Sequence, residues 1–221
     1  MKKNQVSASY ITVIAMFAAV SYVLVIISKA IPNVAGFLSY EPKDAMIVIA
    51  GLLFGPLSSV LISLIVSFIE MITISSTGFY GFIMNAIASC AFSVLPAWYY
   101  QKNRTKKGAI IGLCGGVICM TAVMLLWNYI ITPLYMHVDR SVVVGMMATV
   151  FLPFNLIKGG INAGLTLVFY KPIVTALRSA KLAKPSNTEA EKGKFSIGFL
   201  AFSLAVLITF VLLFLVLIGV I

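Results

Sequence analysis

The sequence predicts an all-α integral membrane protein. Of its 221 residues, 61% are hydrophobic and only 10% are charged, and the mean hydropathy is +1.08. Such a composition is far from that of a soluble domain, and apolar segments of about 20 residues can cross a bilayer as helices. The net charge of +10 does not indicate nucleic-acid binding, because the basic residues are clustered between the apolar segments. In that position they act as topology signals in the lipid bilayer.

Seven apolar segments predict seven helices. The expected ranges are 8–27, 45–54, 57–74, 81–100, 108–131, 150–170 and 195–221. The second segment would form a helix of about 15 Å, so it spans only half of a hydrocarbon core of about 30 Å. It ends at Gly55-Pro56 and resembles the interrupted helices that line sites in transporters. The alternative is a longer helix that begins before Ala45.

The basic residues predict the orientation of the chain. Twelve of the 16 lie on one side of the seven segments: Lys2, Lys3, Lys102, Arg104, Lys106, Lys107, Lys171, Arg178, Lys181, Lys184, Lys192 and Lys194. We expect that side to be cytoplasmic. The protein would then be a multi-pass protein of the cell membrane, with its N-terminus inside and its C-terminus outside.

One lysine inside the sixth segment indicates a buried polar site. An ammonium group in hydrocarbon costs about 3 kcal/mol or more, so Lys158 should face a cavity rather than lipid. Asn155 lies three residues earlier and shares its helix face. The alternative is that Lys158 extends to the headgroups. In the predicted orientation Lys158 lies about 12 Å into the outer half of its helix, so the cavity should open outward.

Further polar and aromatic side chains are expected at the outer end. The candidates for ligand contact there are Tyr40, Phe79, Tyr80, Asn85 and Asn128. The two amides supply both donors and acceptors for a polar ligand. Aromatic rings in such positions are equally typical of an interfacial belt. Glu70, near the outer end of the third segment, is ambiguous because an interfacial position would also explain it.

The sequence lacks the motifs of several other functional classes. No GxxxxGK[ST] motif is present to bind ATP phosphates, and no HExxH motif or paired carboxylates to hold a metal or activate water. We therefore expect no catalytic residues, no metal and no cofactor. The helix interiors carry no carboxylate beyond Glu70, which disfavours a proton-coupled carrier. A binding protein for a small, mostly uncharged polar molecule remains.

Four stretches resemble the substrate-binding S components of energy-coupling factor (ECF) vitamin transporters, and among them the riboflavin-specific group. They are Tyr40-Glu41-Pro42-Lys43-Asp44 ahead of residues 51–56, Gly81-Phe82-Ile83-Met84-Asn85, Asn128-Tyr129 with Pro133-Leu134-Tyr135, and Pro153-Phe154-Asn155-Leu156-Ile157-Lys158-Gly159. The resemblance covers about residues 8–182.

This resemblance implies a six-helix ECF S-component bundle, residues 1–182, that binds riboflavin from outside with high affinity. Uptake would be driven by ATP hydrolysis in partner subunits, a transmembrane T component and two ATPases. Asn128, Asn155 and Lys158 would hold the polar edge of the flavin ring, and the nearby aromatic residues would cover it. Ala15 and Ala19 resemble the AxxxA face that docks onto the T component, although internal packing is an alternative for two small residues.

The last segment departs from the family pattern. Residues 195–221 follow a charged linker, residues 183–194, and add a probable seventh transmembrane helix. The sequence assigns this helix no task. Deleting it should leave ligand binding intact if the six-helix unit is self-sufficient.

Three alternative functions stay open. The chain could be an S component for another vitamin such as thiamine, because few residues distinguish such cavities. It could be a membrane scaffold that binds no small molecule and uses its Asn and Lys residues to hold helices together. It could also be a proton-coupled carrier, which would take up its substrate without partners.

Overall fold

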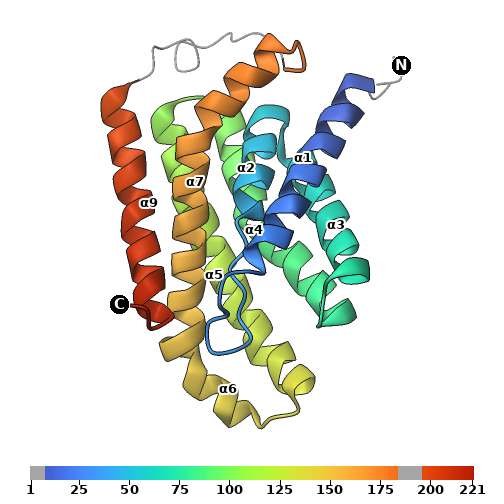
Figure 1. Cartoon of the computed structure of the whole chain (residues 1–221), viewed down its shortest axis with the longest axis vertical. Helices are drawn as coiled ribbons and strands as arrows, with labels where there is room; N and C mark the ends of the chain where they lie inside the picture. The colour runs from blue at the N-terminus through green and yellow to red at the C-terminus, as the bar shows by residue number, and fades with distance from the viewer. Residues whose placement is uncertain (1–7, 184–195) are drawn as a thin grey trace.

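All seven apolar segments form helices in the computed structural model, which describes residues 8–183 and 196–221 (Figure 1). The helices are α1 (Ala8–Ser28), α2 (Lys43–Phe54), α3 (Pro56–Thr73), α4 (Gly78–Lys102), α5 (Lys106–Met136), α6 (Arg140–Met146), the π-helical turn η1 (Met147–Phe151), α7 (Leu152–Ser179) and α9 (Ile197–Leu217). The fold prediction of a helical membrane bundle with a further C-terminal helix is therefore confirmed. The predicted linker, residues 183–194, lies outside the described residues except for its first residue.

Six helical segments among the described residues are long and apolar enough to cross a membrane. The short helix is α2, whose 12 residues give a length of about 18 Å. It begins at Lys43 rather than Ala45, so residues before Ala45 do extend it. Its end is sharp because Gly55 has a φ of 103°, a conformation that favours glycine, and Pro56 starts α3.

The sixth predicted segment is longer than expected. The helical backbone begins at Arg140, which the sequence had placed in a loop, and continues through η1 into α7. The π-helical turn lies just before Pro153, whose ring nitrogen has no hydrogen to donate. The apolar pattern did not predict this extension, because it begins with the polar residues Arg140 and Ser141.

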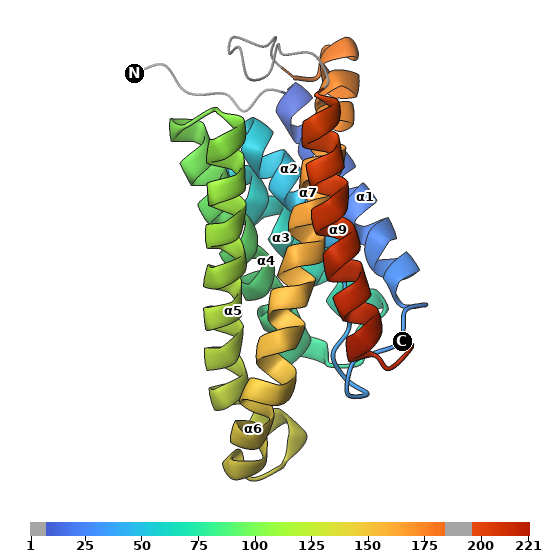
Figure 2. The same ribbon diagram turned by 90° about the vertical axis from the view of Figure 1, so that its left-hand side faces the viewer.

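Helix α2 lies at the centre of the bundle. It packs against α1, α3, α4 and α7, and nine of its residues are buried (Figure 1). Helix α9 lies along the outer side of α7, at the left edge of the bundle in Figure 1 and at its front in Figure 2. The bundle has two distinct ends. We call the end where α4 ends and α5 begins the basic end, and the end where α1 ends the cavity end.

Candidate ligand-binding cavity

A hollow opens at the cavity end between the α1–α2 loop, the α3–α4 turn and helices α4, α5 and α7. It encloses about 1280 Å³ of empty space, including the part that is open to solvent. Five of the seven residues expected to contact a ligand line it: Tyr80, Asn85, Asn128, Asn155 and Lys158. These residues come from three different helices, so the fold brings together side chains that are distant in the sequence.

The two asparagines from α5 and α7 are buried in the cavity wall. Asn128 is 4% exposed, and its Oδ1 accepts a hydrogen bond of 2.9 Å from Thr132 Oγ1 one turn later. Asn155 is 3% exposed, and its Nδ2 donates to the backbone oxygen of Phe151 at 2.8 Å. Each amide keeps further donor or acceptor capacity, because one amide group can form up to four hydrogen bonds.

Lys158 lies in the cavity wall and not in lipid. Its side chain is 9% exposed, and its Nζ lies 4.0 Å from Glu41 Oε2. Asn155 lies one turn before it on the same face of α7, as the three-residue spacing predicted. A nearby carboxylate and a polar cavity stabilise the ammonium group, which would be unfavourable in hydrocarbon.

A cluster of buried charges surrounds this lysine. Lys43 Nζ lies 2.8 Å from Glu41 Oε2 and donates a hydrogen bond of 2.7 Å to Glu70 Oε2. Asn85 Nδ2 also donates to Glu70 Oε2, at 3.0 Å. Lys29, which is partly exposed, approaches Glu70 Oε1 at 3.5 Å. The cluster joins the first loop to α2, α3 and α4.

The charges around Glu41 control its ionisation. Burial alone would raise the pKa of this carboxyl group, but the ammonium groups of Lys43 and Lys158 outweigh burial and lower the pKa to about 2. Glu41 is therefore a carboxylate at neutral pH. A carboxylate and an ammonium side by side in the cavity wall can accept and donate hydrogen bonds to one polar ligand.

The structure shows where two carboxylates lie. Glu70, whose position the sequence left ambiguous, is 3% exposed within the charge cluster. Asp44 was expected in a loop, but it lies in the first turn of α2, fully buried, and accepts a hydrogen bond of 2.5 Å from Ser89. The bundle interior therefore holds carboxylates that the apolar pattern concealed. Their presence removes the sequence-based objection to a proton-coupled carrier.

Two of the expected contact residues do not line the cavity. Tyr40 is 7% exposed and packs against Phe214 of α9, with ring centroids 5.5 Å apart. Phe79 is 65% exposed and lies beside Phe82. Tyr80 does reach the cavity, where its ring lies 5.9 Å from that of Tyr135. A residue's position along the chain, whether in the α1–α2 loop for Tyr40 or in the first turn of α4 for Phe79, does not fix the direction of its ring.

Sequence reasoning missed Asn162 as a structural anchor of the site. Its Nδ2 donates to the backbone oxygen of Glu41 at 3.1 Å, and its Oδ1 accepts from the backbone N–H of Ala45 at 3.3 Å. It thereby gives a second acceptor to the N–H group of Ala45 in the first turn of α2, which also donates to the backbone oxygen of Pro42 at 3.2 Å. The available signal was its spacing of four residues from Lys158, which places both on one face of α7.

Ala15 and Ala19 both lie on the exposed face of α1, whereas Ala18 is buried at 4% exposure. The three alanines therefore lie on two different faces of α1. The two small residues that the AxxxA spacing selects face outward, so neither is used for packing within the bundle. They leave a shallow surface on which another helix can approach closely.

A cavity that opens at one end of a membrane bundle and is lined by amides, hydroxyl groups and charged side chains defines a membrane-embedded substrate-binding protein. The family model for the substrate-specific component of ECF transporters matches residues 9–170. The chain belongs to this family of transporter components and is not an enzyme.

Individual relatives agree with this assignment. The chain is 29% identical over 185 residues to the riboflavin transporter FmnP of Bacillus subtilis, covering 78% of this chain and 97% of the relative. It is also 29% identical over 174 residues to the riboflavin transporter RibU of Streptococcus thermophilus, covering 74% and 82% respectively. A solved S component of a bacterial ECF transporter superposes with a TM-score of 0.65 at 26% identity, covering 76% of this chain and 96% of that one.

Proposed function

We propose that this chain binds riboflavin with high affinity and delivers it for uptake as the substrate-specific subunit of an ECF transporter. The observation that carries the proposal is the convergence of Asn128, Asn155 and Lys158 on one cavity. Riboflavin has a flat apolar ring system, an imide-like edge with alternating acceptors and a donor, and a hydroxylated chain. The two riboflavin transporters among the relatives support this choice of ligand.

The cavity chemistry matches the polar edge and the apolar face of the ring system. The amides of Asn128 and Asn155 can pair with both donors and acceptors of the ring edge, and Lys158 can donate to a carbonyl oxygen or ring nitrogen. Met84, Met124 and Trp127 supply apolar and aromatic contact in the same wall. Riboflavin is here a transported ligand and not a cofactor.

The energy for uptake would come from partner subunits, a T component and two ATPases. Ala15 and Ala19 are proposed as the T-component docking surface, because they are small, one turn apart and exposed. The excess of Lys and Arg at the basic end supports a cytoplasmic position for that end. The cavity end would then face outward, with the N-terminus inside and the C-terminus outside.

The test is to purify the protein in detergent, record its visible absorption spectrum, and titrate the ligand-free form with riboflavin while following flavin fluorescence. Yellow flavin that co-purifies, together with saturable quenching, is the expected result. Competition with thiamine tests the alternative vitamin. A stable protein that ignores both vitamins would overturn the proposal and favour a scaffold, and uptake by the chain alone in proteoliposomes under a pH gradient would favour a proton-coupled carrier.

A further inference from the structure

The C-terminal helix α9 has a closely fitted contact with α7. A Cβ atom added at Gly160 would lie 2.3 Å from the ring of Phe210, and one added at Gly164 would lie 2.9 Å from the Cα of Leu207. The two glycines are one turn apart and so allow the backbones to approach closely. The family match ends at residue 170, before α9. This chain therefore carries an additional helix that is packed specifically against the helix that bears Asn155 and Lys158.

The far end of α9 reaches the loop that forms one wall of the cavity. Phe214 is 6% exposed and its ring contacts that of Tyr40. Both rings belong to a buried apolar cluster that also contains Val34 from the same loop and Phe154 and Ile157 from α7. Tyr40 thus lies between the cavity wall and α9.

The loop segment before Tyr40 has a compact form of its own. The backbones of Val34 and Leu38 exchange hydrogen bonds of 2.9 and 3.0 Å, and Ser39 Oγ donates to Asn33 Oδ1 at 2.9 Å. Phe37, Leu38 and Ser39 line the cavity. A displacement of Tyr40 would consequently move a cross-linked turn, and not one side chain, away from the ligand.

We propose that α9 holds the α1–α2 loop closed over the cavity, with Phe214 as the positioning residue that acts through Tyr40. This inference rests on the proposed riboflavin function. Loss of the ring of Phe214 should speed ligand release more than it slows ligand entry. Aromatic pairs contribute about 0.5–1.5 kcal/mol, so we expect the dissociation rate constant of Phe214→Ala to rise about 2- to 10-fold.

The experiment is stopped-flow flavin fluorescence with the full-length protein in detergent, which gives association and dissociation rate constants separately. Leu213→Ala is the matched control, because Leu213 is 46% exposed on the same helix. Phe214→Tyr, which keeps the ring, should retain the slow wild-type release. If Phe214→Ala does not fold, Phe214→Leu keeps most of the apolar volume without the ring and takes its place.

A double-mutant cycle isolates the contact. Phe214→Ala should have little further effect in a Tyr40→Ala background, because the partner ring is already absent. Wild-type release from Phe214→Ala would overturn the role of α9 while leaving the proposed function intact. Failure of the wild-type protein to bind riboflavin would overturn the proposed function itself, so the two failures are distinguishable.

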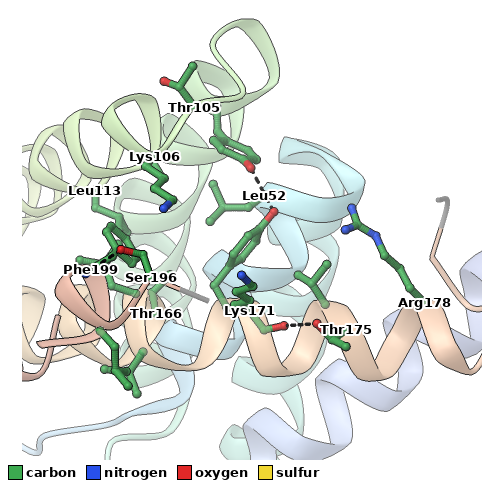
Figure 3. A pocket seen from close by; sticks show the side chains of 17 residues that line it. Leu52, Thr105, Lys106, Leu113, Thr166, Lys171, Thr175, Arg178, Ser196 and Phe199 are labelled. Carbon is green, nitrogen blue, oxygen red and sulfur yellow. Dashed lines mark hydrogen bonds between the residues drawn. The ribbon is translucent and has the colours of Figure 1, made fainter. Parts of the chain in front are cut away.

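A second, independent observation concerns the basic end. A hollow of about 880 Å³ lies there between α5, α7 and α9 (Figure 3). Its floor is apolar and includes Leu52, Leu113 and Leu167, whereas Lys106, Lys171 and Arg178 contribute three positive charges to its lining. None of the described lining residues is acidic.

Its place in the bundle connects this hollow with the membrane. Helix α9 packs mainly against α7, and residues of α5, α7 and α9 line the hollow. Lys106 extends from α5 toward α9, where its Nζ lies 5.3 Å from the ring centroid of Phe199. Basic pockets between transmembrane helices on the cytoplasmic side suit anionic headgroups, with acyl chains against apolar walls.

From this we infer that the hollow binds an anionic phospholipid, whose phosphate lies near Lys106 and whose acyl chain covers the apolar floor. The test compares thermal unfolding in nanodiscs of phosphatidylglycerol and of phosphatidylcholine, with mass-spectrometric counting of retained lipid. Phosphatidylglycerol should stabilise the wild type and the Lys107→Gln control, whose changed residue does not line the hollow.

The variant Lys106→Gln should lose that preference. Equal retention of phosphatidylglycerol by this variant would overturn the inference. Equal stabilisation by inorganic phosphate in detergent would identify an anion site and overturn the lipid assignment. The segment 184–195 carries Glu189 and Glu191, so the test also includes the variant in which both are replaced by Gln. Lipid binding that occurs only after both are replaced by Gln would assign the hollow to that segment instead.

Discussion

Lys43 and Glu70 form an ion pair inside the helical bundle, with Lys43 Nζ 2.7 Å from Glu70 Oε2 and side-chain exposures of 1% and 4%. The pair connects the first residue of α2 to the last turns of α3. It is hydrogen-bonded on both sides, since Asn85 donates to the same carboxylate oxygen and Glu41 lies against the lysine. Removal of one partner would leave uncompensated charge in a dry environment.

Lys43→Met should therefore lower the free energy of unfolding by about 3–5 kcal/mol, because Glu41 and Glu70 lose their shared buried cation. Thermal unfolding in detergent measures this effect. Lys29→Met is the matched control: its side chain is 39% exposed, so a change of about 0–1 kcal/mol is expected. The triple variant Lys43→Met/Glu41→Gln/Glu70→Gln should regain part of the lost stability. An unchanged free energy of unfolding in Lys43→Met would show that the ion pair does not stabilise the fold.

Lys158→Met should weaken riboflavin binding by the free energy of a hydrogen bond to a charged group, about 1.5–3 kcal/mol, or roughly 10- to 150-fold in Kd. Titration of flavin fluorescence measures the change. Lys107→Met, at the basic end, is the control and should bind like the wild type. Unchanged affinity in a folded Lys158→Met protein would remove this lysine from the ligand site.

The pH dependence of stability should reveal the ionisation of Glu41. Its pKa is lowered from 4.5 to about 2 in the folded protein, so its contribution is fully present above about pH 4.5. The contribution is lost as the pH falls from about 4.5 to about 2. The Tm difference between the wild type and Glu41→Gln should be constant at higher pH and shrink in this window. A difference that does not change with pH would contradict the ion-pair account.

Ala15→Trp/Ala19→Trp should abolish co-purification with the T component while leaving riboflavin affinity unchanged, because both alanines are exposed and distant from the cavity lining. Pull-down of the co-expressed subunits and fluorescence titration measure the two effects. Ile118→Trp places the same ring on an exposed position of α5 and should keep the partner bound. If the Ala15→Trp/Ala19→Trp protein still co-purifies with the T component, the proposed docking surface is wrong.

The helices of this fold follow from the sequence because six of the seven apolar segments have the length that the bilayer requires, and the short second one ends at Gly55-Pro56. The presence of Lys158 in the cavity wall follows from the cost of placing its charge in lipid. Neither principle locates the partners of that charge. Glu41 and Lys43 were assigned to a loop, and only the packing of α2 between four helices shows that they are buried. Pairs such as Lys43 and Glu70 depend on how helices meet, and helical periodicity does not contain that information.

The direction of individual aromatic side chains could not be predicted either. Tyr40 lies in the α1–α2 loop and packs against Phe214 of α9, whereas Phe79 lies in the first turn of α4 and is exposed. For both rings tertiary contacts decide the direction, and local sequence patterns carry no signal for it. The π-helical turn ahead of α7 was also not predicted, because its sequence, Met147–Phe151, is compatible with an ordinary α-helix.

The charge cluster of the cavity also bears on how the membrane potential acts on this protein. Lys29, Lys43 and Lys158 balance Glu41, Asp44 and Glu70, so the six side chains sum to zero when all are ionised. Each uncompensated elementary charge that crosses a membrane does work of about 2.3 kcal/mol per 100 mV. A balanced cluster that is displaced as a unit does no net electrical work, so the membrane potential acts on this protein through its other charges.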